Sequence, residues 1–151
     1  MKHSDKATEL FAKGYNCAQA VFAAFCDVTG MEEDKALALS SSFGGGMGRM
    51  REVCGAVSGS FLVAGALFGY ADTDPASKKA HYELIQDIAK RFKEKNHDTI
   101  ICKELLVGIK TDATPTPSER NEHYYKVRPC VKFVIDACDI LDEIIKEKCD
   151  L

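Results

Sequence analysis

The chain has 151 residues and a mass of 16.6 kDa, which suits one domain that can bury a core without disulfide bonds. It is 46% hydrophobic and 28% charged, a composition that excludes intrinsic disorder as the main state. The net charge of −3 and the pI near 5.8 argue against a nucleic-acid-binding protein, because such domains usually carry a basic excess.

Helix signals begin near the N-terminus. Ser4 is the expected N-cap of a first helix, which Gly14 interrupts. Asn16 is then expected to cap a second helix over residues 17–25, and Gly30 is expected to end that segment. These signals predict short helices joined by tight breaks.

The middle of the chain predicts another helix start, a glycine-rich loop and a long apolar helix. Residues 31–34 bring three acidic side chains, which the dipole of a helix N-terminus favours. Residues 43–49 contain too many glycines to be regular, and a central helix is expected from about Glu52 to Gly69. Residues 53–71 carry no charge, but their four glycines and the lack of a basic flank favour a buried helix over a membrane span.

The C-terminal half adds further helix starts. Asp74–Pro75 is a cap followed by a first-turn proline, and Asp98 or Thr99 is expected to cap a short helix. Residues 118–120 are expected to open another helical piece, and Pro129 to start the last helix. Because no alternating strand pattern or long linker interrupts these signals, we expect one all-α domain over residues 1–151, a multi-helix bundle around the glycine-rich central helix.

Seven cysteines are the unusual feature of the composition. The polar segment 1–6 lacks the apolar core of a signal peptide, so we expect a cytoplasmic protein, in which permanent disulfides are rare. Four of the seven fall near predicted helix starts, where free backbone N–H groups and the helix dipole lower a thiol pKa. These candidate redox or metal-binding residues are Cys17, Cys54, Cys102 and Cys130.

The other three cysteines have simpler interpretations. Cys26 would face away from Cys17 on a continuous helix, Cys138 lies on an apolar stripe, and Cys149 is expected to be exposed. No Cys-x-x-Cys pair occurs, so no thioredoxin motif or zinc ribbon is present, and without Cys-x-x-Cys-His we expect no covalent haem.

The glycine-rich loop allows two interpretations. Gly44, Gly45 and Gly46 could present backbone N–H groups to an anionic ligand, helped by Arg49 and Arg51. The loop matches neither a Walker A sequence nor a dinucleotide fingerprint, which favours a tight turn. In the following helix, the pairs Gly55/Gly59 and Gly65/Gly69 are expected to let a neighbouring helix approach closely.

Several of these residues together resemble a known family. The resemblance rests on Gly-Tyr-Asn-Cys-Ala at 14–18, Cys-Gly-Ala-Val-Ser-Gly at 54–59, Cys-Lys-Glu-Leu-Leu at 102–106, and Cys130. In their order and spacing they resemble the C_GCAxxG_C_C family of redox-active proteins, which is also similar to the non-haem part of split-Soret cytochromes. The resemblance implies a redox site at the four cysteines and makes an iron–sulfur cluster conceivable. It implies no particular substrate or reaction, and whether the protein is an enzyme stays open.

Three functions follow as alternatives. In the first, the four cysteines do redox work, either as iron–sulfur ligands or as reversible disulfide pairs, for which three pairings are open. The electron donor or acceptor would be a small molecule or a protein. In the second, the four thiolates hold zinc in a structural module. In the third, the glycine-rich loop and its arginines bind a small anion and the cysteines belong to the core. The sequence leaves the oligomeric state open, and a site shared between two subunits is one alternative.

Overall fold

The computed structural model describes residues 1–149. These residues fold as helices, which confirms the predicted all-α class. The N-terminal part contains α1 (His3–Ala12), α2 (Cys17–Ala24), α3 (Cys26–Thr29), α4 (Glu33–Ser40), the 3₁₀ helix η1 (Ser41–Phe43), α5 (Gly44–Met47) and α6 (Gly55–Phe68). The C-terminal part contains α7 (Pro75–Lys95), α8 (Cys102–Leu105), α9 (Glu122–Val127) and α10 (Cys130–Cys149).

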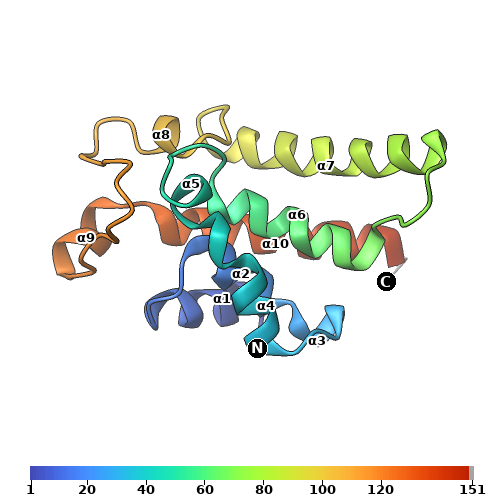
Figure 1. Ribbon diagram of the computed structural model, residues 1–151, viewed down its shortest axis with the longest axis horizontal. Coiled ribbons are helices and arrows are strands. Elements are labelled where there is room, and N and C mark those ends of the chain that lie inside the picture. The colour runs from blue at the N-terminus through green and yellow to red at the C-terminus, as the bar shows by residue number, and fades with distance from the viewer. Residues whose placement is uncertain (150–151) are drawn as a thin grey trace.

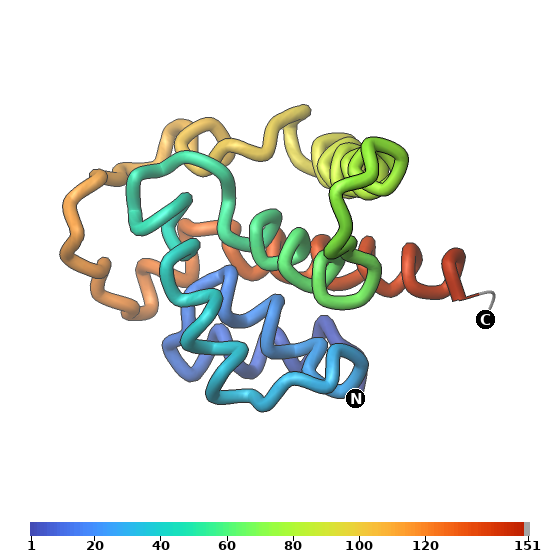
Figure 2. Tube along the Cα trace, turned by 45° about the vertical axis from the view of Figure 1, so that its right-hand side comes forward, coloured from blue at the N-terminus to red at the C-terminus, as the bar shows by residue number. Residues whose placement is uncertain are grey.

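The glycine-rich helix α6 lies in the middle of the bundle, as predicted (Figure 1). It packs against α2 on one side and α7 on the other, and α10 packs against α1, α2, α6 and α7. The turned view sees α7 nearly end-on while α10 runs across the picture, so the two long helices cross (Figure 2). Within residues 1–149, no helix is long and apolar enough to cross a membrane.

The close approach of α2 to α6 depends on two glycines. A Cβ atom at Gly59 would lie 2.9 Å from the carbonyl oxygen of Ala18, and one at Gly55 would lie 3.1 Å from the Ala18 nitrogen. The predicted packing role is therefore confirmed for this pair. It is wrong for Gly65, where a Cβ atom would meet nothing within 4 Å.

Local capping signals mostly match the structure. The Asn16 side chain accepts a hydrogen bond from the backbone N–H of Gln19, whose side chain accepts one from the N–H of Asn16. The Asp74 carboxylate caps α7 through the N–H of Ala76, and Gly30 ends α3 in the left-handed conformation. These signals work because every hydrogen bond involved closes within a few residues.

The expected cap at Ser4 is wrong, because α1 begins at His3 and Lys2 is its N-cap. The helix extends to His3 through contacts made elsewhere in the chain. The two ring nitrogens of His3 lie 2.7 Å from Asp142 on α10 and 2.9 Å from Asp27 on α3. A tertiary contact has therefore moved this helix boundary.

Two C-terminal predictions are also wrong. Ile101 is the N-cap of α8, while the Thr99 hydroxyl accepts a hydrogen bond from the Ile101 N–H without capping the helix. Asp98 adopts a positive φ and lies outside the helix. Residues 118–120 are not helical, and α9 begins after Asn121, whose side chain accepts a hydrogen bond from the Tyr124 N–H.

Candidate functional site

The four motif cysteines line one cavity of about 60 Å³. Cys17, Cys102 and Cys130 each begin a helix, and Cys54 immediately precedes α6. The cavity lies at the end of the bundle where α5, α8 and the start of α10 gather (Figure 1). Its volume matches that of a few water molecules, so the four thiols border a small, partly open pocket.

A short antiparallel bridge fixes two of these cysteines. It joins the residue before Cys54 to the residue before Cys102. The N–H of Cys54 donates to the carbonyl of Ile100 at 2.8 Å, and the N–H of Cys102 donates to that of Glu52 at 2.6 Å. The bridge holds the chain extended up to Cys54, which is why α6 begins at Gly55, later than the start near Glu52 that the sequence predicts.

The glycine-rich loop makes a tight turn beside the cavity. Gly45 and Gly46 have φ values of 65° and 73°, in the left-handed region that favours glycine. A Cβ atom at Gly46 would lie 2.7 Å from the Cβ of Cys102 and 2.8 Å from the Cα of Arg51. Arg49 and Arg51 also adopt positive φ values, which cost a residue with a side chain about 1–2 kcal/mol. The loop thus brings two arginines to the site at a conformational cost.

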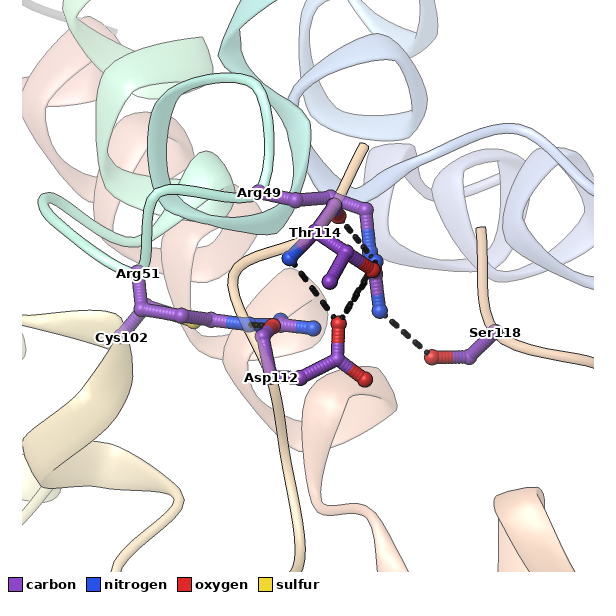
Figure 3. A network of polar contacts seen from close by, with 6 residues as sticks. All are labelled: Arg49, Arg51, Cys102, Asp112, Thr114 and Ser118. Atoms are coloured by element: carbon purple, nitrogen blue, oxygen red, sulfur yellow. Dashed lines mark hydrogen bonds and ion pairs between the residues drawn. The ribbon is translucent and has the colours of Figure 1, made fainter. Parts of the chain in front are cut away.

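Three arginines around the cavity have no carboxylate partner. Within the described part of the chain, no ion pair involves Arg51, Arg120 or Arg128, and all three line the cavity. The residue Arg51 is only 6% exposed, its Nη1 lies 3.7 Å from the sulfur of Cys102, and its Nε donates to the carbonyl of Asp112 at 3.0 Å (Figure 3). A buried cation costs several kcal/mol without an opposite charge. Thiolates or an anionic ligand could supply that charge.

Arg49 lies further out and holds the loop that follows α8. Its guanidinium lies 3.3 Å from the carboxylate of Asp112, donates to the carbonyl of Thr114, and donates to the hydroxyl of Ser118 at 3.0 Å (Figure 3). Hydrogen bonds from Thr114, with the charge of Arg49, hold the pKa of Asp112 below its usual value. Arg49 therefore has a structural role that the sequence analysis did not predict.

The other two arginines come from the segment before α10. Arg120 donates to the carbonyls of Phe11 and Tyr15 at 2.6 and 2.8 Å, and Arg128 lies over the ring of Tyr124 at 5.0 Å. Sequence reasoning missed both. The position of Arg128 two residues before a motif cysteine was a usable signal, whereas nothing near Arg120 in the sequence predicts its contact with the end of α1.

Cys130 has the thiol that is most easily ionised. A hydrogen bond from the Cys17 thiol, supported by the charges of the three unpaired arginines, outweighs burial and lowers the pKa of Cys130 to about 7. The same hydrogen bond, together with burial, raises the pKa of Cys17 well above its usual value. Within this pair the Cys130 thiol is therefore the one that ionises first as the pH rises.

Cys54 and Cys102 behave differently. Burial raises the pKa of Cys54 to about 12, although the N–H groups of Ala56 and Val57 oppose the shift. Burial also raises the pKa of Cys102, against the opposing effect of Arg51. Of the four helix-start thiols that were predicted to have a lowered pKa, only Cys130 has one, and the prediction is wrong for the other three. The interaction with Cys130 is the main cause of the raised pKa at Cys17, whereas burial outweighs the helix dipole at Cys54 and Cys102.

The remaining cysteines lie away from the cavity, as expected. Cys138 is fully buried in the core, Cys149 is exposed, and Cys26 begins α3. All seven thiols are free. Among residues 1–149, no three or more His, Cys, Asp or Glu side chains are arranged to hold a metal ion.

The comparisons with known proteins give one result. The family model described as "Putative redox-active protein (C_GCAxxG_C_C)" matches residues 15–144, a range that contains all four cavity cysteines. No curated protein and no solved structure matches the chain. Because the match covers most of its length, this chain belongs to the C_GCAxxG_C_C family.

Proposed function

We propose that the protein performs reversible thiol–disulfide exchange, with Cys130 as the attacking thiolate and Cys17 as its partner. One observation carries this proposal: Cys17 and Cys130 line the same cavity with three arginines that have no carboxylate partner, and the interaction of the two thiols lowers the pKa of Cys130 while it raises that of Cys17. A thiol with a pKa of about 7 is half ionised at neutral pH, and the thiolate is the form that attacks disulfides.

The exchange proceeds in two balanced steps. The Cys130 thiolate bonds to one sulfur of a disulfide substrate, whose S–S bond breaks, and the released thiolate takes up a proton. The sulfur of Cys17 then loses its proton and bonds to the sulfur of Cys130, which releases the second half of the substrate as a thiol. Two electrons pass from the protein to the substrate, and the reverse sequence regenerates the dithiol.

Cys54 and Cys102 form the second pair in this proposal. Of the three pairings that four cysteines allow, the interaction between the Cys17 and Cys130 thiols favours one, and that pairing leaves Cys54 with Cys102. Burial holds the pKa of both these thiols above the usual value whether or not Cys130 has reacted, so they are slow to attack. The raised pKa of Cys17 depends mainly on Cys130, and this effect is lost once Cys130 has bonded to the substrate. The placement of Cys54 and Cys102 supports a role as acceptors of oxidation from the first pair.

A second candidate function is electron transfer through an iron–sulfur cluster. Its support is that four thiols from four helix starts surround one cavity, next to cations that would balance an anionic cluster. A cluster places its own atoms between its ligands, whereas a single Zn²⁺ needs all four sulfurs about 2.3 Å from one point. Four thiols around a cavity of this size therefore favour a cluster over a single zinc ion. When bound, a cluster would supply one-electron transfer.

The deciding experiment starts with anaerobic purification, followed by iron, sulfide and zinc analysis and a visible spectrum. The metal-free protein then has its free thiols counted before and after treatment with a small disulfide. Thiol–disulfide exchange predicts a metal-free protein that loses thiols in pairs, with Cys138→Ala behaving as the parent. Iron with matching sulfide, lost in Cys54→Ser and kept in Cys138→Ala, would establish the cluster. An unchanged thiol count would overturn the exchange proposal.

A further inference from the structure

A groove of about 590 Å³ lies beside the cysteine cavity. Four arginines line it, Arg49, Arg51, Arg120 and Arg128, and no Asp or Glu side chain does. The glycine loop contributes Gly44 and Gly45 to its wall. Its volume is typical of sites that bind small molecules. A groove bordered by one sign of charge concentrates ligands of the opposite sign, so this groove favours an anion.

The groove and the cavity are adjoining parts of one site. Both are lined by Arg51, Arg120, Arg128, Tyr124 and Asn16. A molecule that lies along the groove can therefore extend into the cavity past the same guanidinium groups. The arginines stand between the solvent-facing groove and the four thiols, and an incoming substrate meets them before it meets sulfur.

Two of these cations have donor groups left over for a ligand. Arg128 is half-buried, and its guanidinium contacts the ring of Tyr124, while no carboxylate within residues 1–149 pairs with it. Arg51 is 6% exposed, and its protein partners are a thiol sulfur and a backbone carbonyl. Guanidinium groups bind carboxylates through two parallel hydrogen bonds. A carboxylate is therefore a ligand group that these donors fit.

We propose that the groove binds a small disulfide that carries carboxylate groups and directs its sulfurs into the cysteine cavity. This inference rests on the proposed exchange function and names the substrate class for it. The substrate oxidises the protein: its S–S bond breaks, Cys17 and Cys130 become joined, and two molecules of a carboxylate-bearing thiol leave. Because a thiolate repels anionic disulfides, a preference for an anionic substrate needs cations such as these arginines.

The test uses three aliphatic disulfides of similar size and different charge. They are the dianion 3,3′-dithiodipropionate, neutral bis(2-hydroxyethyl) disulfide and dicationic cystamine. The rate of thiol loss from the reduced protein is measured with each disulfide. It is then divided by the rate at which the same disulfide reacts with a simple dithiol. We expect the dianion to react at least about tenfold faster than the neutral disulfide after this correction, and the preference to shrink as salt is added.

The variant Arg128→Gln separates the groove from the reactive thiol. It should reduce the ratio of dianion to neutral rates by about tenfold, because one charged hydrogen-bonding partner of the carboxylate is lost. The ratio is the relevant quantity, since any effect on the ionisation of Cys130 changes both rates alike. The exposed Lys126→Gln on α9 removes an equal charge outside the groove and should leave the ratio unchanged.

A binding measurement distinguishes failure of this inference from failure of the exchange function. Octanedioate has the same number of chain atoms between its two carboxylates as 3,3′-dithiodipropionate but no sulfur, and its binding to Cys130→Ser is measured by calorimetry. Binding that Arg128→Gln abolishes supports the groove even if no disulfide reacts. If disulfides react without a charge preference and octanedioate does not bind, exchange stands and the carboxylate inference is wrong.

Discussion

Cys130 and Cys138 lie about two turns apart on α10 and have opposite surroundings. Cys138 is fully buried among apolar side chains, and burial raises its pKa. Cys130 is 8% exposed, yet its pKa falls to about 7. Burial is similar at the two positions. The difference in pKa comes from the interaction of Cys17 with Cys130 and from the arginines that have no carboxylate partner. These groups surround Cys130 and are not among the groups that shift the pKa of Cys138.

The comparison teaches that a cysteine's neighbours, more than its depth, decide whether it can react. A buried thiol without a cation or a donor behaves as a small apolar side chain. The same thiol beside guanidinium groups and a second thiol becomes a nucleophile at neutral pH. This distinction between a reactive and an inert buried thiol can be tested at both Cys130 and Cys138.

The largest effect is expected from the two cysteines themselves. Cys130→Ser should abolish thiol loss with a disulfide substrate, because the attacking sulfur is gone. Cys138→Ala should keep the parent rate and lose about 1–2 kcal/mol of unfolding free energy, since it leaves a small void in the core. Rates of thiol loss and denaturant unfolding measure the two quantities. If both variants lost their reactivity with the disulfide, the proposed difference between Cys130 and Cys138 would be contradicted.

Two glycine substitutions test how tightly the chain is packed at the cavity wall, which includes Gly46, and away from it, at Gly65. Gly46→Ala should cost at least about 2 kcal/mol of unfolding free energy, because its φ of 73° suits glycine and a Cβ would lie 2.7 Å from that of Cys102. Gly65→Ala meets nothing within 4 Å and should stabilise α6 by about 0.5–1 kcal/mol. Thermal or denaturant unfolding measures both. Equal effects at the two sites would contradict the described packing.

Alkylation at different pH values tests the ionisation of Cys130. Its folded pKa of about 7 lies below the usual value of 9.0, so thiolate forms as pH rises through about 7 and is lost below it. At pH 7 about half of the Cys130 thiol should be ionised, against about 1% of a thiol with a pKa of 9.0, so its thiolate fraction should be about fifty times larger. Iodoacetamide labelling followed by peptide mass spectrometry gives the rate at each cysteine. A Cys130 profile with a midpoint near 9 would be the contrary result, and Cys54 should label slowly throughout because burial raises its pKa to about 12.

How much of this was readable from the sequence depends on how local each interaction is. The cap at Asn16 and the start at Asp74–Pro75 were predicted, because their hydrogen bonds close within three residues. The bridge between residues 53 and 101 was not, since neither segment has a strand pattern and each needs the other. The three raised thiol pKa values were missed for the same reason, because the contact of Cys17 with Cys130 and the burial of Cys54 and Cys102 both depend on the whole fold.

In the candidate site, too, local features were predicted from the sequence and long-range contacts were not. The positions of the four cysteines were predicted from helix starts and from the family resemblance, and the structure brings them to one cavity. The importance of Arg51 was underestimated, because its contact with Cys102 depends on the positive φ that the loop imposes. Arg120 reaches the carbonyl of Phe11 across more than a hundred residues of sequence, and no local pattern predicts that.

The smallest effect is expected at Arg49, outside the cavity. Its ion pair with Asp112 is partly exposed, and such pairs contribute less than about 1 kcal/mol. Arg49→Gln should therefore leave global stability nearly unchanged and increase proteolysis in residues 112–118, which its hydrogen bonds hold in place. Limited proteolysis and denaturant unfolding measure the two effects. A stability loss above about 2 kcal/mol would show that the loop supports the core.

Disulfide mapping by mass spectrometry tests the central claim most directly. The reduced protein is treated with one equivalent of a small disulfide, alkylated, and digested without reduction. The account predicts a peptide linked through Cys17 and Cys130, formed before any other link, with Cys138 fully alkylated after unfolding. Four cavity thiols that all remain free, or a first link through Cys149 between two molecules, would contradict it.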